Sequence, residues 1–434
     1  MFANYGEERG MIHTAVIRIA GRYSLLFLGS LMGSLQAQDT LFARRVIEDL
    51  CSRKLAGRGY VQDGALKAAA LLEAELLKAG VQAWNGTYRH DFFIPVNTIP
   101  ELDVQCGGRR LKPGIDVLAD AASPSWKGSL FLRKWSWADT LYYPRGPWRS
   151  LGTVPAVPEA MLSHPIWGKR ISALRAQHPV PVWVNLVPRL PAWGVATETA
   201  SRVVLWLRED RVQHDIRLEL NIKNQHKPSQ LCRNVLAFIP GTHRPDSLLV
   251  LTAHYDHLGR MGKAVFPGAN DNASGVAMVL DMARDLAKKP LPYSVMVVFF
   301  AAEEAGLLGS AAVIRDRVLP LNRIRFLLNL DLMGTGETGM TVVNASIFPK
   351  EFSLMDSLNR EHQFLPAINK RGKAANSDHY FFTEAGVPSF FGYLSGPRPA
   401  YHSTDDIPQT LTLHGYVNTY RLYRMFLEQL TSGK

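Results

Sequence analysis

Short, largely apolar runs alternate with segments of helical spacing in the carboxyl-terminal half of the chain. The apolar runs cover residues 248–253, 295–300 and 325–330, and the helical patterns cover residues 275–287 and 307–318. Strands that are apolar on both sides are typical of sheets whose two faces are covered by helices. The pattern therefore predicts an α/β fold with a mixed, mostly parallel sheet.

Two helices are expected near the start of this body. Asp39 is a candidate cap for a helix that runs to about Ser52, and Asp63 is a candidate cap for a second helix that ends at Gly80. One stripe in the second helix has the spacing of a buried face and consists of Ala65, Ala69, Leu72, Leu76 and Ala79. We expect residues 39–95 to be the helical part of a domain that continues at 229–434.

The middle region, residues 96–228, differs in composition from both flanks. Eight of the nine tryptophans lie between residues 126 and 206, and proline is frequent. Residues 212–222 alternate apolar and polar residues, and residues 202–207 form a short run that is apolar after Arg202. This pattern indicates short strands joined by long loops. We expect a β-rich insertion in which tryptophan serves packing rather than an aromatic ligand site.

The first 38 residues have the pattern of a secretory signal peptide. Arg18 and Arg22 precede an apolar run over residues 23–35, and the small residue Ala37 follows it. We expect cleavage after Ala37 and a periplasmic or secreted protein; a buried first helix is the alternative, and Met11 is an alternative start. No run reaches the roughly 18 apolar residues of a membrane-spanning helix, so no stable membrane anchor is expected after cleavage.

Composition and charge limit the class of protein and the kinds of partner that are expected. The 434 residues, 47% of them hydrophobic and 20% charged, have the composition of a globular protein of two or three domains. The net charge of +11 admits a nucleic-acid partner, but the basic residues form no long run and no nucleic-acid motif occurs, so none is expected. Cys51, Cys106 and Cys232 lie too far apart for a zinc ribbon, and any two of them remain candidates for a disulfide.

Acidic and imidazole side chains follow each of the three apolar runs. His254 and Asp256 follow the first run, Glu303 and Glu304 follow the second, and Asp331 follows the third. Because ligand sites gather at the carboxyl ends of the strands in such sheets, we expect these side chains to converge.

Two further segments add candidate ligands. Residues 268–275 form a loop rich in glycine and asparagine with one carboxylate, Asp271, and His402 lies in the segment 401–406. Two imidazoles and several carboxylates suit zinc, with cobalt or manganese as substitutes. A shared carboxylate would hold two metals about 3.5–4 Å apart, as in two-metal hydrolases. A serine hydrolase is not favoured, because no nucleophile elbow surrounds Ser403.

The order of these motifs resembles the M28 family of zinc peptidases, which includes secreted aminopeptidases and the glutamate carboxypeptidase II group. The resemblance covers about residues 231–406, extends to the segment 55–60, and leaves the insertion without a matching motif. Its motifs are His254-x-Asp256, Asn270-Asp271-Asn272-Ala273-Ser274-Gly275, Glu303-Glu304-x-Gly306-Leu307-x-Gly309-Ser310, Asn329-Leu330-Asp331, Ser377-Asp378-His379 and Tyr401-His402.

The resemblance implies a role for each matching residue. Asp271 would bridge two zinc ions; one site would be completed by His254 and Asp331, and the other by Glu304 and His402. Catalytic roles would fall to Glu303 as general base and to Asp256, which would hold the ring of His254. Groups near the site would include Asp378 and His379, whereas His257, Tyr393, Arg398 and Tyr401 are candidates for the substrate pocket or for ordinary packing.

The resemblance therefore implies a secreted metal-dependent exopeptidase, with peptides as substrates. An aminopeptidase is favoured, in which a metal-activated water hydrolyses the amino-terminal residue with Glu303 as general base. A carboxypeptidase or dipeptidase on the same fold and a glutaminyl-cyclase-like transferase remain enzyme alternatives. A basic binding protein that uses residues 96–228 is the alternative without catalysis.

Overall fold

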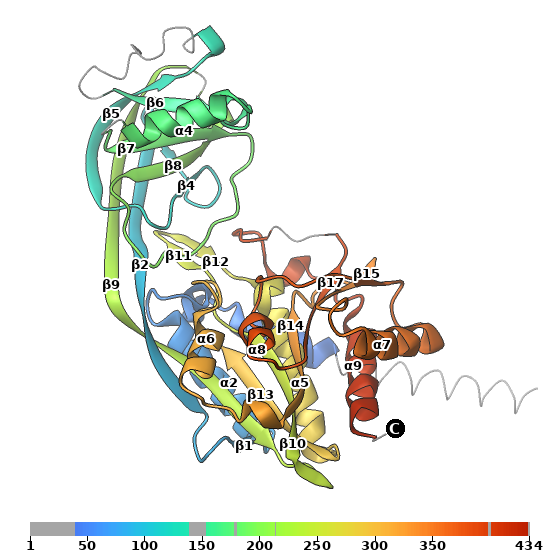
Figure 1. Cartoon of the computed structure of the whole chain (residues 1–434). Helices are drawn as coiled ribbons and strands as arrows, with labels where there is room; N and C mark the ends of the chain where they lie inside the picture. Colours follow the sequence, from blue (N-terminus) through green and yellow to red (C-terminus); the bar gives the residue numbers. More distant parts are fainter. Residues whose placement is uncertain (1–39, 139–152, 178–179, 213, 398–400, 433–434) are drawn as a thin grey trace, which may run out of the picture.

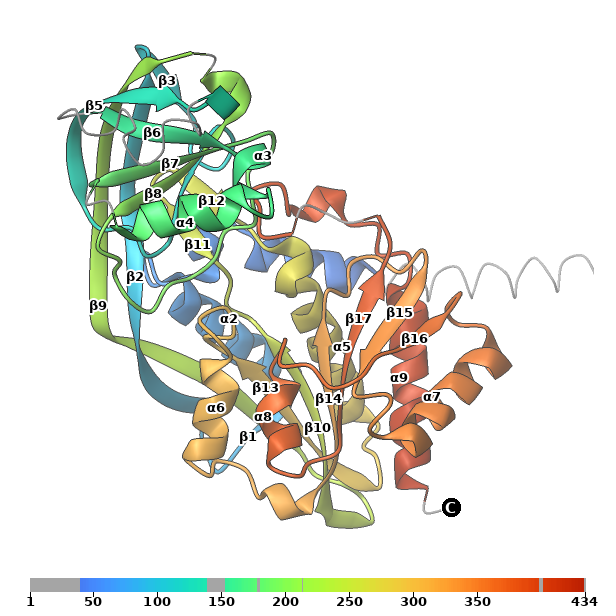
Figure 2. The same ribbon diagram turned by 45° about the horizontal axis from the view of Figure 1, so that its top comes forward.

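The computed structural model describes residues 40–138, 153–177, 180–212, 214–397 and 401–432. The predicted signal peptide lies outside these residues. We call the described part of residues 96–228 the lobe and the remainder the core. Figure 1 shows the lobe projecting from one side of the core, and Figure 2 shows the same two parts with the lobe turned forward. No helix in the described ranges is long and apolar enough to cross a bilayer.

The core contains a mixed sheet whose central pairs are parallel. Its strands lie in the order β9 (Ile216–Ile239), β13 (Tyr293–Phe300), β10 (Arg244–His254), β14 (Ile324–Asp331), β17 (Ser389–Ser395), β15 (Gly339–Val343) and β16 (Ile368–Lys370). The pairs from β13 to β17 run parallel, whereas β9 and β15 pair antiparallel with their inner neighbours. The predicted α/β class and mostly parallel sheet are confirmed.

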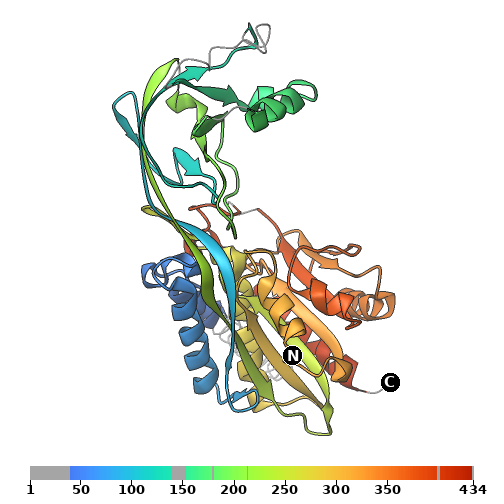
Figure 3. The same ribbon diagram turned by 60° about the vertical axis from the view of Figure 1, so that its left-hand side comes forward.

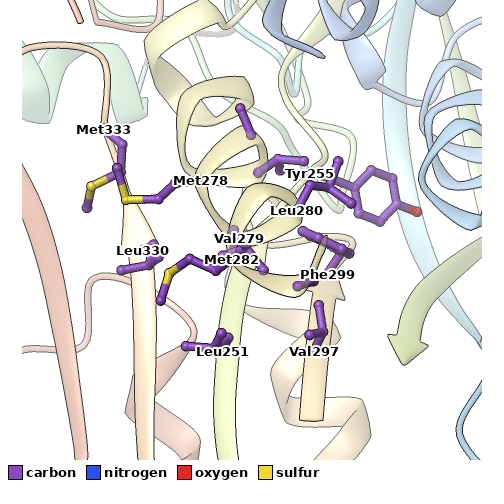
Figure 4. Packing of buried hydrophobic residues seen from close by; sticks show 14 of the residues in the cluster. Leu251, Tyr255, Met278, Val279, Leu280, Met282, Val297, Phe299, Leu330 and Met333 are labelled. Atoms are coloured by element: carbon purple, nitrogen blue, oxygen red, sulfur yellow. The ribbon is translucent and has the colours of Figure 1, made fainter. Parts of the chain in front are cut away.

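Helices cover both faces of this sheet. One face packs against the helix over residues 40–50, α2 (Gly64–Lys78), α5 (Gly275–Lys288) and α9 (Tyr416–Thr431), with α7 (Pro349–His362) outside α9. The other face packs against α6 (Leu308–Arg315) and α8 (His379–Glu384). Figure 4 shows the first face, where Val279 and Met282 of α5 lie near Leu251, Val297 and Leu330 of the strands. Apolar residues at every strand position therefore have a helix to pack against.

The predicted second helix forms, but its capping differs from the prediction. Asp63 precedes α2 with φ 56° and makes no side-chain capping hydrogen bond. In the predicted stripe, Ala65, Ala69, Leu72 and Leu76 are buried, whereas Ala79 is half-buried. The helix is therefore held by its buried face rather than by a cap.

Two long strands join the core to the lobe. The strands β2 (Arg89–Cys106) and β9 pair antiparallel from Arg89 with Val235 to Cys106 with Leu218, and Figure 3 shows them bending from the core into the lobe. The predicted limits of the insertion fall inside these two strands, and the domain limits themselves stay a prediction.

The lobe is built from short strands with two helices. The strands are β3 (Arg109–Leu111), β4 (Val117–Ala119), β5 (Trp126–Lys134), β6 (Thr153–Pro158), β7 (Val182–Val187) and β8 (Val203–Arg208), and the helices are α3 (Glu159–Leu162) and α4 (Trp167–Gln177). A hairpin of the core, β11 (Gly259–Met261) and β12 (Ala264–Phe266), places Met261 and Phe266 in the apolar cluster of the lobe. The lobe and the core therefore share a buried contact at this hairpin.

The remaining elements are short. They are β1 (Gln82–Ala83), which pairs with β9, and the single turns η1 (Arg53–Arg58), η4 (Glu209–Arg211), η6 (Leu321–Arg323) and η7 (Pro408–Thr410). The thiols of Cys51, Cys106 and Cys232 are all free, so no disulfide links the lobe to the core.

Candidate metal centre at the sheet edge

The predicted ligands meet at the carboxyl ends of three neighbouring strands. His254 is the last residue of β10, Asp331 is the last residue of β14, and Glu303 and Glu304 follow β13. A pocket of about 380 Å³ opens here and is lined by His254, Asp271, Glu303 and Asp331 among others. We call His254, Asp271, Glu303, Glu304, Asp331 and His402 the edge cluster.

Asp271 lies between the two imidazoles of the cluster. Its Oδ1 is 3.2 Å from Nε2 of His254, and its Oδ2 is 3.1 Å from Nε2 of His402. The same His254 nitrogen is 3.4 Å from Oδ2 of Asp331, and the same His402 nitrogen is 3.1 Å from Oε2 of Glu304. The cluster thus consists of two groups of donors that share one carboxylate.

The loop that carries Asp271, Ala269–Ser274 (η5), is fixed by its own side chains. The Asn272 amide donates to the Leu330 carbonyl at 3.0 Å, and its Oδ1 accepts the Gly275 N–H at 3.0 Å. Gly268 precedes the loop at φ 62°, and a Cβ there would lie 2.2 Å from the carbonyl oxygen of Asp271. The glycine therefore allows the loop to close tightly on itself, and Asn272 bonds the loop to β14.

Two buried residues outside the predicted site also hold this loop. The carboxylate of Asp406 accepts the backbone N–H groups of Asn270 at 2.9 Å and Asp271 at 3.1 Å. Arg58, whose side chain is fully buried, donates to the carbonyls of Tyr255 at 2.7 Å and Gly268 at 2.8 Å. Sequence reasoning left both residues without a role, although each belongs to a segment quoted for the family resemblance.

The carboxylate of Asp256 positions the turn after β13, and only its backbone carbonyl faces the ring of His254. Its Oδ1 accepts the Glu303 N–H at 3.1 Å, and its Oδ2 accepts the Glu304 N–H at 3.4 Å and the Tyr60 hydroxyl at 3.4 Å. Nδ1 of His254 lies 3.2 Å from the backbone carbonyl of Asp256 but 3.8 Å from its carboxylate. The residue therefore orients the ring through its main chain, and burial raises the pKa of its carboxyl to about 6.

His257 contacts the edge cluster. From the sequence alone, this residue was a candidate for the substrate pocket or for ordinary packing. Its Nδ1 is 2.7 Å from Oε1 of Glu304, so the two oxygens of Glu304 face His257 and His402 separately. The ring is fully buried. Its place in sequence, directly after the His254-x-Asp256 motif, was the available signal.

Divalent cations fit this donor set. In the described chain, Nε2 of His402 and Oδ1 of Asp331 are buried without a hydrogen-bond partner, and buried polar atoms are rarely left unsatisfied. Ligand atoms of His254, Glu303 and Asp331 lie within 4.8 Å of one another, as do those of His257, Asp271 and Glu304. Imidazole nitrogen and carboxylate oxygen are the ligands of catalytic zinc sites, and a cation would offset the repulsion among buried carboxylates.

Glu303 faces the pocket with an altered acidity. Burial raises the pKa of its carboxyl well above the usual range, while His254 acts in the opposite direction. A carboxylate with a raised pKa that lines a pocket has the properties of a general base.

The remaining predicted residues that the structure describes form two pairs. Asp378 and His379 are buried at the start of α8, where burial raises the pKa of Asp378 to about 7 and lowers that of His379 to about 4. Tyr393 and Tyr401 line the pocket, and the ring of Tyr401 stacks on that of His402 with centroids 3.9 Å apart. Arg398 lies outside the described residues.

Sequence comparison finds a match to a known family over the part of the chain that carries most of these motifs. Residues 234–427 match Peptidase family M28. A "Probable leucine aminopeptidase" of Arthroderma otae is 33% identical over 195 residues, which are 42% of this chain and 53% of that protein. Aminopeptidase YwaD of Bacillus subtilis is 27% identical over 238 residues, 51% of this chain and 50% of that protein. The chain thus spans about half the length of these curated relatives.

Solved structures match over a larger part of the chain. A zinc aminopeptidase from Bacillus subtilis superposes with a TM-score of 0.68 at 19% identity, covering 90% of this chain and 95% of that one. An aminopeptidase from Aneurinibacillus sp. strain AM-1 superposes with a TM-score of 0.61 at 18% identity, covering 90% and 93%. These likenesses confirm the fold, lobe included.

Proposed function

We propose that the protein is a zinc-dependent aminopeptidase, and the match of residues 234–427 to Peptidase family M28 supports this proposal. The observation that carries the proposal is the position of Asp271, whose two carboxylate oxygens face His254 and His402 separately. A bridging carboxylate of this kind holds two metals in two-metal hydrolases. We assign one zinc to His254, Asp271 and Asp331, and the other to Asp271, Glu304 and His402.

The residues of the chain then have distinct tasks. Bound zinc supplies Lewis-acid polarisation of the scissile carbonyl and lowers the pKa of a water molecule. Glu303 removes a proton from that water and returns it to the leaving amine. Asp256 holds the Glu303 main chain in place through its hydrogen bond to the N–H. Tyr393 and Tyr401 line the pocket in which the amino-terminal residue of a peptide would lie.

The test combines metal content with a substrate panel. The purified protein is analysed for zinc per chain and assayed on peptides with a free amino end, a blocked amino end and a free carboxyl end, with and without chelator. We expect two zinc ions and chelator-sensitive cleavage of peptides with a free amino end. Cleavage of amino-blocked peptides alone would favour a carboxypeptidase and contradict the proposal, as would activity that persists after zinc is removed.

We further propose that residues 1–38 direct export to the periplasm or the medium. The basic flank, the apolar run over residues 23–35 and Ala37 support this proposal. Cell fractionation and amino-terminal sequencing of the mature protein test it. Export with an amino terminus at Gln38 is expected, and a cytoplasmic protein that retains the segment contradicts it.

A further inference from the structure

The lobe contacts the edge cluster directly, through a loop between β7 and β8. Trp193 in this loop and His402 in the core are 209 positions apart, yet their backbones are hydrogen-bonded: the Trp193 N–H donates to the His402 carbonyl at 3.1 Å. Nδ1 of His402 is 2.7 Å from the carbonyl oxygen of Trp193. Two hydrogen bonds between the same two residues define both the position and the ring orientation of His402.

The second of these hydrogen bonds also selects the tautomer of His402. A carbonyl oxygen can only accept, so Nδ1 carries a proton and Nε2 is the ring nitrogen that can bind a metal. Nε2 is also the nitrogen that faces Asp271 and Glu304, each 3.1 Å away. Metal-bound histidines generally have such an acceptor on the second ring nitrogen, and its loss lowers metal affinity.

His402 needs external support because its backbone is in an unfavourable region. Its φ is 53°, which residues other than glycine rarely adopt. A second contact from the lobe lies two residues further on, where the Thr404 hydroxyl donates to the Gly114 carbonyl at 3.3 Å. The segment 402–404 is therefore bonded to the lobe at the left-handed residue and again two residues after it.

Trp193 is itself fixed firmly within the lobe. Its ring stacks on Phe266 with centroids 4.6 Å apart, and its indole N–H donates to the Ala119 carbonyl at 2.8 Å. The side chain is 8% exposed. The loop is bonded again at Ala196, whose carbonyl accepts the Asn97 N–H at 2.8 Å. The acceptor that faces His402 is thus held by buried contacts with the lobe and with the core hairpin that packs against it.

We propose that the lobe completes one of the two zinc sites, because the main chain of Trp193 holds His402 in the tautomer and orientation that binds metal. Trp193 is in this sense a positioning residue, and the lobe is part of the metal site rather than an accessory. The inference rests on the assignment of His402 as a zinc ligand in the proposed function.

The experiment compares zinc binding by Trp193→Ala, Trp193→Phe and the control Trp206→Ala. Trp206 lies in β8 against the apolar clusters of the lobe, so its variant reports on packing within the lobe. Each metal-free protein is titrated with Zn²⁺ in a calorimeter, and circular dichroism checks its fold. In the wild type and Trp206→Ala we expect two zinc ions per chain.

For Trp193→Ala we expect the affinity for one of the two zinc ions to fall about 10- to 100-fold, with the other unchanged. Trp193→Phe retains the aromatic contact with Phe266 and should lose less, and it replaces the alanine variant if that variant does not fold. Histidine ¹⁵N spectra of the zinc-loaded wild type should show His402 with its proton on Nδ1.

Three results would overturn the inference. They are unchanged affinity for both ions in the folded Trp193 variants, an equal loss in Trp206→Ala, and a proton on Nε2 of His402. A wild type that binds fewer than two zinc ions would instead contradict the metal assignment of the proposed function, so the two failures are distinguishable.

Discussion

The edge cluster and the lobe hold buried polar groups for opposite reasons. In the edge cluster, Asp271, Glu304 and Asp331 face two shared imidazoles, and bound cations would relieve the repulsion among these carboxylates. In the lobe, the buried carboxylate of Asp116 has an ordinary cationic partner, Arg211, at 2.8 Å. Buried carboxylates that lack a cationic side chain therefore mark the candidate metal site. A buried carboxylate paired with arginine marks a structural contact of the lobe.

The largest effect on zinc content and activity is expected when the shared carboxylate of Asp271 is removed. Asp271→Ala should lower zinc content to one ion or none and reduce kcat/KM by more than the roughly 10²- to 10⁴-fold that loss of a general base costs, since both sites use Asp271. Elemental analysis and peptidase assays measure the two effects. A variant that keeps two zinc ions would show that Asp271 does not bridge them.

The second prediction separates chemistry from metal binding inside the cluster. Glu303→Gln should lower kcat about 10²- to 10⁴-fold while zinc content stays unchanged, because the amide cannot accept the proton. Glu384→Gln, an exposed change on α8, is the matched control and should keep full activity. Full activity in Glu303→Gln would remove this residue from the mechanism.

A smaller loss of activity is expected when a residue that only positions the edge cluster is changed. Asp256→Asn replaces one acceptor of the Glu303 and Glu304 N–H groups by a donor, so the turn should shift and kcat/KM should fall about 10- to 100-fold. The exposed Asp405 provides the control change Asp405→Asn. Equal activity of the two variants would contradict the positioning role of Asp256.

The smallest effect on activity is expected in the lobe. Asp116→Asn should leave zinc content unchanged and lower the free energy of unfolding of the lobe by about 1.5–3 kcal/mol at neutral pH, because Arg211 loses its charged acceptor. The tryptophans between residues 126 and 206 make fluorescence in urea a suitable measurement. Loss of zinc in this variant would contradict a purely supporting role of the ion pair.

The same ion pair sets a pH dependence. Burial acts to raise the pKa of Asp116, but the hydrogen bonds from the Lys112 N–H and Arg211 outweigh it and hold the pKa below the usual range. A lowered folded-state pKa means that the stabilisation is present above about pH 3.9 and is lost as the pH falls through the folded-state value. The difference in unfolding free energy between wild type and Asp116→Asn should therefore shrink below about pH 4.

The α/β class and the convergence of the predicted ligands were accessible from sequence for one reason. Parallel strands place their carboxyl ends at one edge of the sheet. Once the three apolar runs are assigned as parallel strands, His254, Glu303 and Asp331 are predicted to lie close together. The role of Asp256 was less accessible, because its carboxylate and its carbonyl differ in what they face and no pattern distinguishes them.

By itself, the sequence of this protein determined the covered sheet, the donor types and their order along the chain, since periodicity and strand ends are local properties. Only the tertiary structure shows which residues, distant in sequence, position the candidate metal ligands. Arg58 and Asp406 fix the Asp271 loop, and Trp193 of the lobe is hydrogen-bonded to His402. Each of these contacts joins a side chain to a main-chain N–H or carbonyl far away in the sequence. Main-chain groups are common to nearly all residues, so the sequence does not mark which of them will be bound.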